Sequence, residues 1–393
     1  MPVLRQIRAR FAVARPLAGV RVAACLHVTA ETANLVRTLH AGGADVRLCA
    51  ANPLSTQDDT AAALAAEHGI TVFARRRVDR SSYDAHVGAA LAHRPALVLD
   101  DGCALIMALH ERAEEVNGVR GGCEETTTGV VRLRQMARDG ALAFPVVDVN
   151  ESGTKHLFDG YGTGQSTVDG LLRATNVLLA GRTVVVAGYG YCGRPVAQRV
   201  AGLGANVVVT EIDATKALDA TLQGYRVLPM AHAAAIGDIF VTVTGNRDVL
   251  TCEHFAAMKD GVILANAGHF DVEIDVPGLA AMAVQTRREV RPNTDEYVLA
   301  DGRRLFLLAQ GRLVNLAAAE GHPASVMDIA FSDQALTLEL LAGAAGGLAP
   351  GVYDVPARID AEVARLKLAS MDVEIDAVTA EQERYLHSWR PGS

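Results

Sequence analysis

Three glycines that follow a run of valines constrain the fold of this chain more than any other feature. Gly188, Gly190 and Gly193 come shortly after the valines at 184–186 and have the Gly-x-Gly-x-x-Gly spacing. A strand, a glycine turn and a helix in this order begin a dinucleotide-binding fold. The first glycine permits the turn, the second lets the backbone approach a pyrophosphate, and the third lets the helix pack against the strand. The segment therefore predicts a fold whose helix N terminus receives the phosphates.

An acidic residue further along the chain indicates which dinucleotide binds. Glu211 ends the next predicted strand, about 20 residues beyond Gly188, where a carboxylate binds ribose hydroxyls. A carboxylate repels the 2′-phosphate of NADP, so the sequence favours NAD, although Lys216 one turn later softens that preference. We expect Tyr191 and Cys192, inside the loop, to contact NAD mainly through their backbone. The simpler alternative, a turn in a flavodoxin-like domain, fits the glycines but does not require the acid.

Short apolar runs alternate with helical patterns in two blocks, which is typical of parallel sheets covered by helices. The first block predicts strands at 20–24, 45–50, 71–74 and 96–99 and helices at 29–41 and 58–67. The second predicts strands at 183–187, 206–211, 238–243 and 262–265 and helices at 195–203 and 214–222. The predicted fold is therefore α/β, with two doubly wound Rossmann-like domains.

The domain limits follow from these blocks. We expect a substrate domain at 1–160 and 323–360, an NAD-binding domain at 161–322, and a helical C-terminal segment at 361–393 that contacts other protomers. The segment 148–165 is rich in Gly, Ser, Thr and Asp and is predicted to be a loop at the domain junction.

The composition excludes several classes of protein. A net charge of -8 argues against nucleic acid or an anionic membrane as the main partner. The most apolar stretch, 335–348, is short and contains Glu339, so it does not predict a membrane span. The six cysteines include no Cys-x-x-Cys pair, which indicates reduced thiols, no zinc site and a cytoplasmic protein.

Motifs along nearly the whole chain resemble those of the S-adenosylhomocysteine hydrolase family. They lie, in the family's order, at 26–32, 55–58, 100–102, 124–129, 154–159, 188–190, 268–273, 311–316 and 321–323. The segment Tyr161–Ser166 is closer to the short bacterial and archaeal branch. The resemblance implies that bound NAD oxidises the 3′-hydroxyl of an adenine nucleoside, after which the C4′ proton is removed and the 5′ substituent leaves. Water then adds, and the ketone is reduced again, giving adenosine and homocysteine.

The resemblance also implies roles for individual residues. Lys155 and Asp159 would handle the proton of the 3′-hydroxyl, for which a lysine base needs a lowered pKa. Asp101 and His27 would transfer protons at C4′ and C5′, and His269 would lie where the nicotinamide meets the sugar. Substrate contacts are expected from Thr29, Glu31, Gln57, Glu125, Thr126, His322, Met327 and Phe331. Further NAD contacts are expected from Thr127, Thr128, Thr244, Asn246, Asn266 and Asn315. A homotetramer, or at least a dimer, is implied as well.

Two positions beside these residues depart from the family pattern. Gly160 stands where the family usually has asparagine, and Ala104 where a further aspartate is usual. Both departures remove a polar group beside a predicted catalytic residue. They leave open a second hypothesis, a paralogue that stops at the alkene and acts as a nucleoside dehydratase, as decoyinine-type antibiotics require. A third, an inactive NAD-binding regulatory homologue, is disfavoured because every principal catalytic position is retained.

Overall fold

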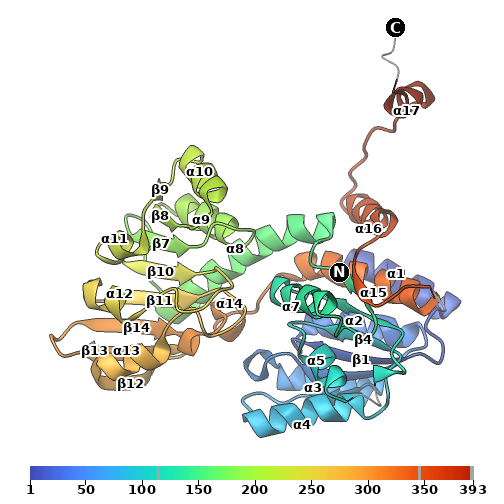
Figure 1. Cartoon of the computed structure of the whole chain (residues 1–393), viewed down its shortest axis with the longest axis horizontal. Helices are drawn as coiled ribbons and strands as arrows, with labels where there is room; N and C mark the ends of the chain where they lie inside the picture. The colour runs from blue at the N-terminus through green and yellow to red at the C-terminus, as the bar shows by residue number, and fades with distance from the viewer. Residues whose placement is uncertain (113–115, 344–346, 390–393) are drawn as a thin grey trace.

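The computed structural model describes residues 1–112, 116–343 and 347–389. It contains two sheets in separate lobes, with one long helix, α8 (Gly153–Thr175), running from one lobe to the other (Figure 1). The predicted α/β class with two Rossmann-like sheets is confirmed.

The first sheet has the strand order β15-β6-β5-β4-β1-β2-β3, and all its pairings are parallel. Its strands are β1 (Arg21–Leu26), β2 (Asp45–Ala50), β3 (Thr71–Phe73), β4 (Leu97–Asp100), β5 (Gly121–Glu124), β6 (Pro145–Asp148) and β15 (Gly351–Asp354). One apolar core lies between the sheet and α1 (Pro2–Ala14), α2 (Ala30–Ala41), α3 (Asp58–His68), α15 (Ala324–Gly343) and α16 (Ala357–Ala369). A second core lies between the sheet and α4 (Arg80–Leu91), α5 (Ala104–His110) and α7 (Thr127–Arg138). The sheet is thus covered on both faces, as parallel strands require.

The second sheet has the strand order β12-β13-β14-β11-β10-β7-β8-β9. The parallel part contains β7 (Thr183–Ala187), β8 (Asn206–Thr210), β9 (Arg226–Val227), β10 (Ile239–Thr242), β11 (Val262–Asn266) and β14 (Arg304–Leu308). β12 (Ala283–Arg291) and β13 (Thr294–Leu299) extend the sheet as antiparallel strands, which were not predicted from the sequence. The covering helices include α9 (Gly193–Gly202), α10 (Ala214–Leu222), α11 (Met230–Ala234), α12 (Cys252–Ala257), α13 (Val276–Met282) and α14 (Val314–Ala317).

The predicted loop at 148–165 is wrong, because most of it belongs to α8. Ser152 caps the helix by accepting a hydrogen bond from the backbone N–H of Lys155, a strong start signal. The glycines that suggested a loop instead allow close helix packing. A Cβ on Gly164 would lie 2.6 Å from the carbonyl oxygen of Pro195, and one on Gly170 would lie 2.5 Å from that of Val314. Burial against neighbouring helices therefore outweighs the low helix propensity of glycine.

The predicted domain limits remain predictions, but their relation to the elements is clear. The limit between 160 and 161 falls inside the unbroken helix α8. The second part of the expected substrate domain, residues 323–360, contains α15 and β15, which complete the first lobe. At the C terminus, α16 buries Ile359 and Val363, whereas α17 (Ala380–Leu386) stands away from both lobes and buries no residue (Figure 1). Among the described residues, no helix is long and apolar enough to cross a membrane.

Candidate active site

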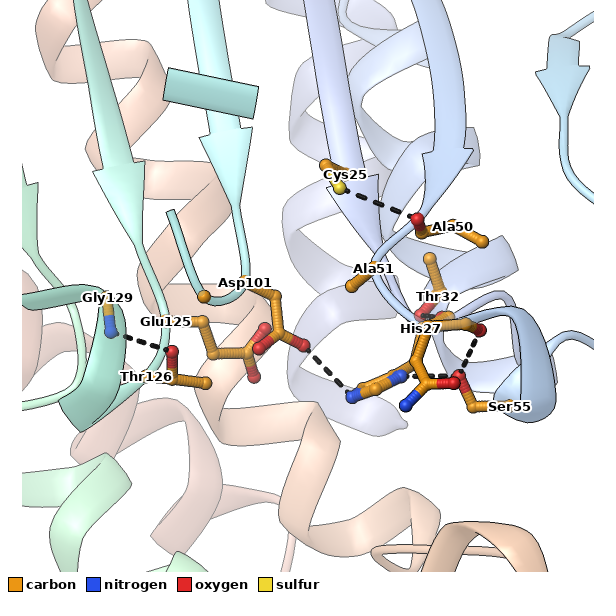
Figure 2. A network of polar contacts seen from close by, with 12 residues as sticks. Cys25, His27, Thr32, Ala50, Ala51, Ser55, Asp101, Glu125, Thr126 and Gly129 are labelled. Carbon is orange, nitrogen blue, oxygen red and sulfur yellow. Dashed lines mark hydrogen bonds and ion pairs between the residues drawn. The ribbon is translucent and has the colours of Figure 1, made fainter. Parts of the chain in front are cut away.

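Three adjacent strands of the first sheet deliver the central side chains. β5, β4 and β1 are neighbours in the sheet, and Glu125, Asp101 and His27 directly follow their carboxyl ends. Ligands of open α/β sheets bind at this edge, where the connections of neighbouring strands diverge. Figure 2 shows Asp101 between the other two side chains. The predicted grouping of His27 and Asp101 is thus present in the structure.

The imidazole of His27 is held at both ring nitrogens. Nε2 lies 3.3 Å from Oδ2 of Asp101, and Nδ1 lies 2.5 Å from Oγ of Ser55 (Figure 2). The Ser55 hydroxyl donates to the carbonyl of Asn52 at 2.9 Å. Since its single proton is used there, Nδ1 of His27 must be the donor to Ser55. Nε2 is then the nitrogen that can take up or release a proton beside Asp101.

Two buried carboxyl groups beneath Asp101 fix the loop that carries it. Asp100 accepts the N–H groups of Asp101 and Ile106, and Glu124 accepts those of Gly102 and Cys103. Burial raises the pKa of Asp100 to about 7 and also raises the pKa of Glu124. In the described chain, no group bonds the buried Oδ1 of Asp101. That oxygen is therefore available to a ligand.

Glu125 and Thr126 are neighbours in the sequence, but their side chains make different contacts. Glu125 is buried and accepts a hydrogen bond from Nε2 of Gln334 at 2.8 Å. Burial, followed by the charge of Asp101, raises the pKa of Glu125 to about 8. The Thr126 hydroxyl caps α7 through Gly129 and donates to Glu124, so its side chain holds the backbone in place.

Lys155 and Asp159 lie one turn apart on α8 and form an ion pair. Burial would lower the pKa of Lys155, but the charges of Asp159 and Glu125 outweigh it and place the pKa above its ordinary value. The expected lowering of this pKa is therefore wrong for the structure as it stands. Nδ1 of His322 lies 3.7 Å from Oδ1 of Asp159, and its Nε2 lies 3.0 Å from Oγ1 of Thr163. Burial lowers the pKa of His322.

His269 reaches the same site from the second lobe. Its ring centre lies 6.5 Å from that of His27, and a Cβ on Gly102 would lie 2.7 Å from its Nε2. Burial lowers its pKa. Arg132 on α7 places its guanidinium 4.8 Å from the ring centre of Phe270 and donates to the carbonyl of Gly102 at 3.2 Å. The two lobes are therefore in contact at the Asp101 loop.

The residues expected near the adenine differ in position and in burial. Thr29 caps α2, and Oε1 of Gln57 accepts the N–H of Ala30 at 3.2 Å, so both lie at one end of that helix. Glu31 is half-buried in its first turn. Phe331 is 2% exposed and belongs to the core of the first lobe, and the partly buried Met327 packs against that core. Their contacts with the substrate remain predictions.

The glycine loop has the shape that a dinucleotide requires. Gly188 has φ of +102°, and a Cβ on Gly193 would lie 1.9 Å from the carbonyl oxygen of Gly188. A Cβ on Gly190 would meet nothing within 4 Å, which leaves room for a pyrophosphate. Glu211 follows β8 and accepts the N–H of Tyr189 at 2.7 Å. Oε1 of Glu211 also accepts the N–H groups of Ile212 and Asp213, so the remaining lone pair for a ribose hydroxyl is on Oε2. These residues fit NAD.

The other residues of this region fall into two groups. The first lies at the surface or partly open, and comprises Thr127, Thr128, Tyr191, Cys192, Thr244 and Asn246. The Tyr191 ring packs on His156 with 3.6 Å between ring centres. The second group is buried: the side-chain amide of Asn266 bonds the carbonyls of Gly268, Phe270 and Gly311 and supports the His269 loop. Asn315 donates to Ser166 at 3.3 Å, and within the described residues its Oδ1 has no partner.

Several supporting residues were not found from the sequence. Ser55, Glu124 and Glu273 lie at the ends of recognised motifs, but the motifs assigned them no role. Glu273 accepts the backbone N–H groups of Thr244 and Gly245. A detectable signal was the polar run at 332–334 within the apolar segment of α15, which contains Gln334. Within residues 1–112, 116–343 and 347–389, no group of His, Cys, Asp and Glu could hold a metal ion.

Comparison with known proteins identifies the family of the chain. Residues 1–119 match the family described as S-adenosyl-L-homocysteine hydrolase, and residues 159–321 match its NAD binding domain. Adenosylhomocysteinase of Aquifex aeolicus is 58% identical over 100% of this chain and 94% of its own length. That of Thermosynechococcus vestitus is 56% identical over 100% of this chain and 92% of its own.

Among solved structures, a dipicolinate synthase chain of Bacillus halodurans is similar in fold, with a TM-score of 0.52 and 16% identity. The match covers 83% of this chain and 99% of that one. The glycine loop lies inside the matched NAD binding domain, so NAD is the cofactor. Because the relatives span the whole chain and are enzymes, the chain is an enzyme that belongs to the S-adenosyl-L-homocysteine hydrolase family.

Proposed function

We propose that the chain converts S-adenosylhomocysteine and water into adenosine and homocysteine, with the predicted site residues performing the proton transfers. The observation that carries the proposal is the convergence of two acid–base pairs, Lys155–Asp159 and His27–Asp101. His322 lies 3.7 Å from Asp159, and the charges of both pairs act on its pKa. The relatives named above are adenosylhomocysteinases and favour hydrolysis over the dehydratase hypothesis.

Lys155 and Asp159 would act at the 3′-hydroxyl. Lys155 is 4% exposed, and its ion pair with Asp159 keeps it an ammonium in the resting site. The ammonium must lose its proton before the amine can accept that of the hydroxyl. Bound NAD supplies the hydride acceptor at C3′. Asp159, also near His322, orients the lysine and sets how readily that first proton leaves.

Asp101 and His27 would act at C4′ and C5′. The free Oδ1 of Asp101 can accept the C4′ proton, because it has no other described partner. Nε2 of His27 can protonate the leaving group at C5′ and later take a proton from the attacking water. The 3.3 Å separation of the two residues lets one support the charge of the other. The elimination and the water addition then use the same pair in opposite directions.

Binding would be divided between the two lobes. Glu125 would hold the ribose hydroxyls. Because its pKa is raised to about 8, it can donate to a hydroxyl when protonated and accept from one when ionised. Thr29, Glu31 and Gln57 would contact the adenine side. His269 would contact the sugar from the second lobe, and the free Oδ1 of Asn315 would accept a hydrogen bond from the nicotinamide amide.

We further propose a cytoplasmic homotetramer or dimer, in which the exposed helix α17 contacts a second copy of the chain.

One experiment separates hydrolysis from dehydration. The purified protein is incubated with S-adenosylhomocysteine and, separately, with adenosine, and the products are identified by mass spectrometry. Hydrolysis predicts adenosine and free homocysteine thiol in equal amounts. A stable nucleoside product lighter by one water, without thiol release, would contradict the proposal. The Lys155→Ala variant should retain NAD and lose turnover, whereas full activity in that variant would refute the role of Lys155.

A further inference from the structure

The N terminus of α8, which carries Lys155, rests on two acidic residues of other helices. Asp333 on α15 is 0% exposed, and its Oδ2 lies 2.9 Å from Oγ of Ser152 and 3.0 Å from Oγ1 of Thr154. Asp360 on α16 lies 2.5 Å from the same Thr154 oxygen. Ser152, in turn, accepts the N–H of Lys155 at 3.2 Å. The two acids thus act on one helix end through two hydroxyl groups.

The two hydroxyls do not carry enough protons for all three oxygen contacts. Ser152 and Thr154 each have one hydroxyl proton. Their contacts are Ser152 to Asp333, Thr154 to Asp333, and Thr154 to Asp360. Three hydrogen bonds between these oxygens therefore need a third proton, which one of the two carboxyl groups must supply. Without it, two oxygen lone pairs would face each other in a buried site, which is unfavourable.

Asp360 is the poorer candidate for that proton. It also accepts the backbone N–H groups of Gly153 and Thr154, at 3.2 and 2.9 Å. The N terminus of a helix favours a negative charge at this position. Asp333 differs, since no described group bonds its buried Oδ1. A fully charged carboxylate with an unpartnered oxygen is costly in the interior, whereas a neutral acid is much less so.

We propose that Asp333 is a positioning residue that works as a neutral carboxylic acid, donating to Thr154 and holding Ser152, and through it Lys155, at the start of α8. Thr154 then donates to Asp360, and every contact has one proton. Burial also raises the pKa of Asp333 to about 7, in the same direction. The charged groups that act on it are Asp360 of α16, which favours the neutral form, and Lys155 of α8, which opposes it.

The inference rests on the proposed role of Lys155, and two substitutions of Asp333 test it. Asp333→Asn keeps a neutral donor of the same shape and should retain kcat within about threefold. Asp333→Leu removes the donor and should lower kcat by about tenfold or more, with a smaller change in KM, because Lys155 is misplaced. An Asp333→Asn variant that loses as much turnover as Asp333→Leu, at equal NAD content, would overturn the neutral acid. Unchanged turnover in Asp333→Leu would overturn the positioning role.

A second measurement does not depend on the reaction. The infrared difference spectrum, wild type minus Asp333→Asn, should contain a protonated carboxyl band near neutral pH, separate from any bands of Asp100, Glu124 and Glu125, which both proteins share. A difference spectrum without such a band refutes the neutral acid. If the wild type shows the band but does not hydrolyse S-adenosylhomocysteine, the proposed function fails and the protonation of Asp333 stands. If it hydrolyses the substrate without the band, the inference about Asp333 fails alone.

Discussion

Nε2 of His27 lies 3.3 Å from Oδ2 of Asp101, and Ser55 dictates which ring nitrogen of that histidine meets the acid. Because the Ser55 hydroxyl is already a donor to Asn52, His27 keeps its proton on Nδ1. The serine thus sets the tautomer without needing to touch the substrate. Supporting residues of this kind commonly matter nearly as much as the groups they orient.

Ser55→Ala should therefore lower kcat by about tenfold, the order seen when an orienting partner is removed. The imidazole would then be free to rotate and to carry its proton on either nitrogen. NAD content and the unfolding temperature should change little. The exposed Ser81→Ala is the matched control and should retain full turnover. Equal turnover in the two variants would show that the serine does not govern the tautomer.

The ion pair on α8 predicts a shift in the pH dependence. Asp159→Asn removes the largest influence that raises the pKa of Lys155. The pKa of the lysine should fall, so the part of the pH–kcat profile that reports its deprotonation should move to lower pH, while the maximal rate drops. Asp169→Asn, which breaks an exposed ion pair on the same helix, should leave the profile in place. An unmoved profile in Asp159→Asn would contradict the coupling.

Glu211 predicts the choice between NAD and NADP. Glu211→Gln removes the charge that repels a 2′-phosphate but keeps an acceptor for the N–H of Tyr189. The ratio of the NADP and NAD dissociation constants should move toward NADP by about tenfold, since each ~1.4 kcal/mol corresponds to that factor. Fluorescence titration of protein freed of cofactor measures both constants. Asp213→Asn, at the cap of α10, is the control and should leave the ratio unchanged.

The departure at Gly160 predicts tolerance of a side chain. A Cβ there would lie 3.8 Å from Cγ of Pro195 and 3.9 Å from the carbonyl oxygen of Tyr191, both ordinary contacts. Gly160→Asn should unfold within about 2 °C of the wild type. Gly164→Asn on the same helix forces a Cβ to 2.6 Å from the oxygen of Pro195 and should lose about 2 kcal/mol of stability. Similar unfolding temperatures for the two variants would contradict this packing.

The buried acids predict how stability depends on pH. The folded pKa values of Asp100 and Glu125 are raised to about 7 and about 8, above the values of about 4 in an unfolded chain. At these two groups the folded state therefore binds more protons than the unfolded state, so their contribution to stability must fall as pH rises from about 4 to about 8. Thermal unfolding at a series of pH values measures this. Glu125→Gln should remove the fall in the upper part of this window, and a curve with the same pH dependence in wild type and Glu125→Gln would refute the assignment.

The sequence predicted those elements of the fold that depend on residues close together along the chain. β2, β7 and α10 have the predicted limits, because alternating apolar runs and caps determine them locally. The glycine loop was recognisable for the same reason. The glycines of α8 were misread because their contacts, Pro195 and Val314, lie far away along the chain. Only the folded chain shows that small residues there serve packing.

In the candidate active site too, residues within motifs could be predicted, whereas contacts between distant residues could not. Lys155, Asp159, Asp101 and His27 lie in recognisable motifs, and the structure brings each pair together. The raised pKa of Lys155 was not predictable, because it depends on Glu125, which follows β5, as well as on Asp159. Ser55, Glu124 and Asp333 act through other residues rather than on a ligand. Their roles depend on hydrogen-bond geometry that spacing along the chain does not reveal.

The unbroken course of α8 has a mechanical consequence. Lys155 lies near one end of the helix, and Gly170, pressed against Val314 of the second lobe, lies near the other. At ~1.5 Å per residue, about 22 Å of rigid rod separates them. A tilt of about 5° at the Gly170 end displaces Lys155 by about 2 Å over this lever arm. The second lobe is therefore mechanically coupled to Lys155 through one rigid helix.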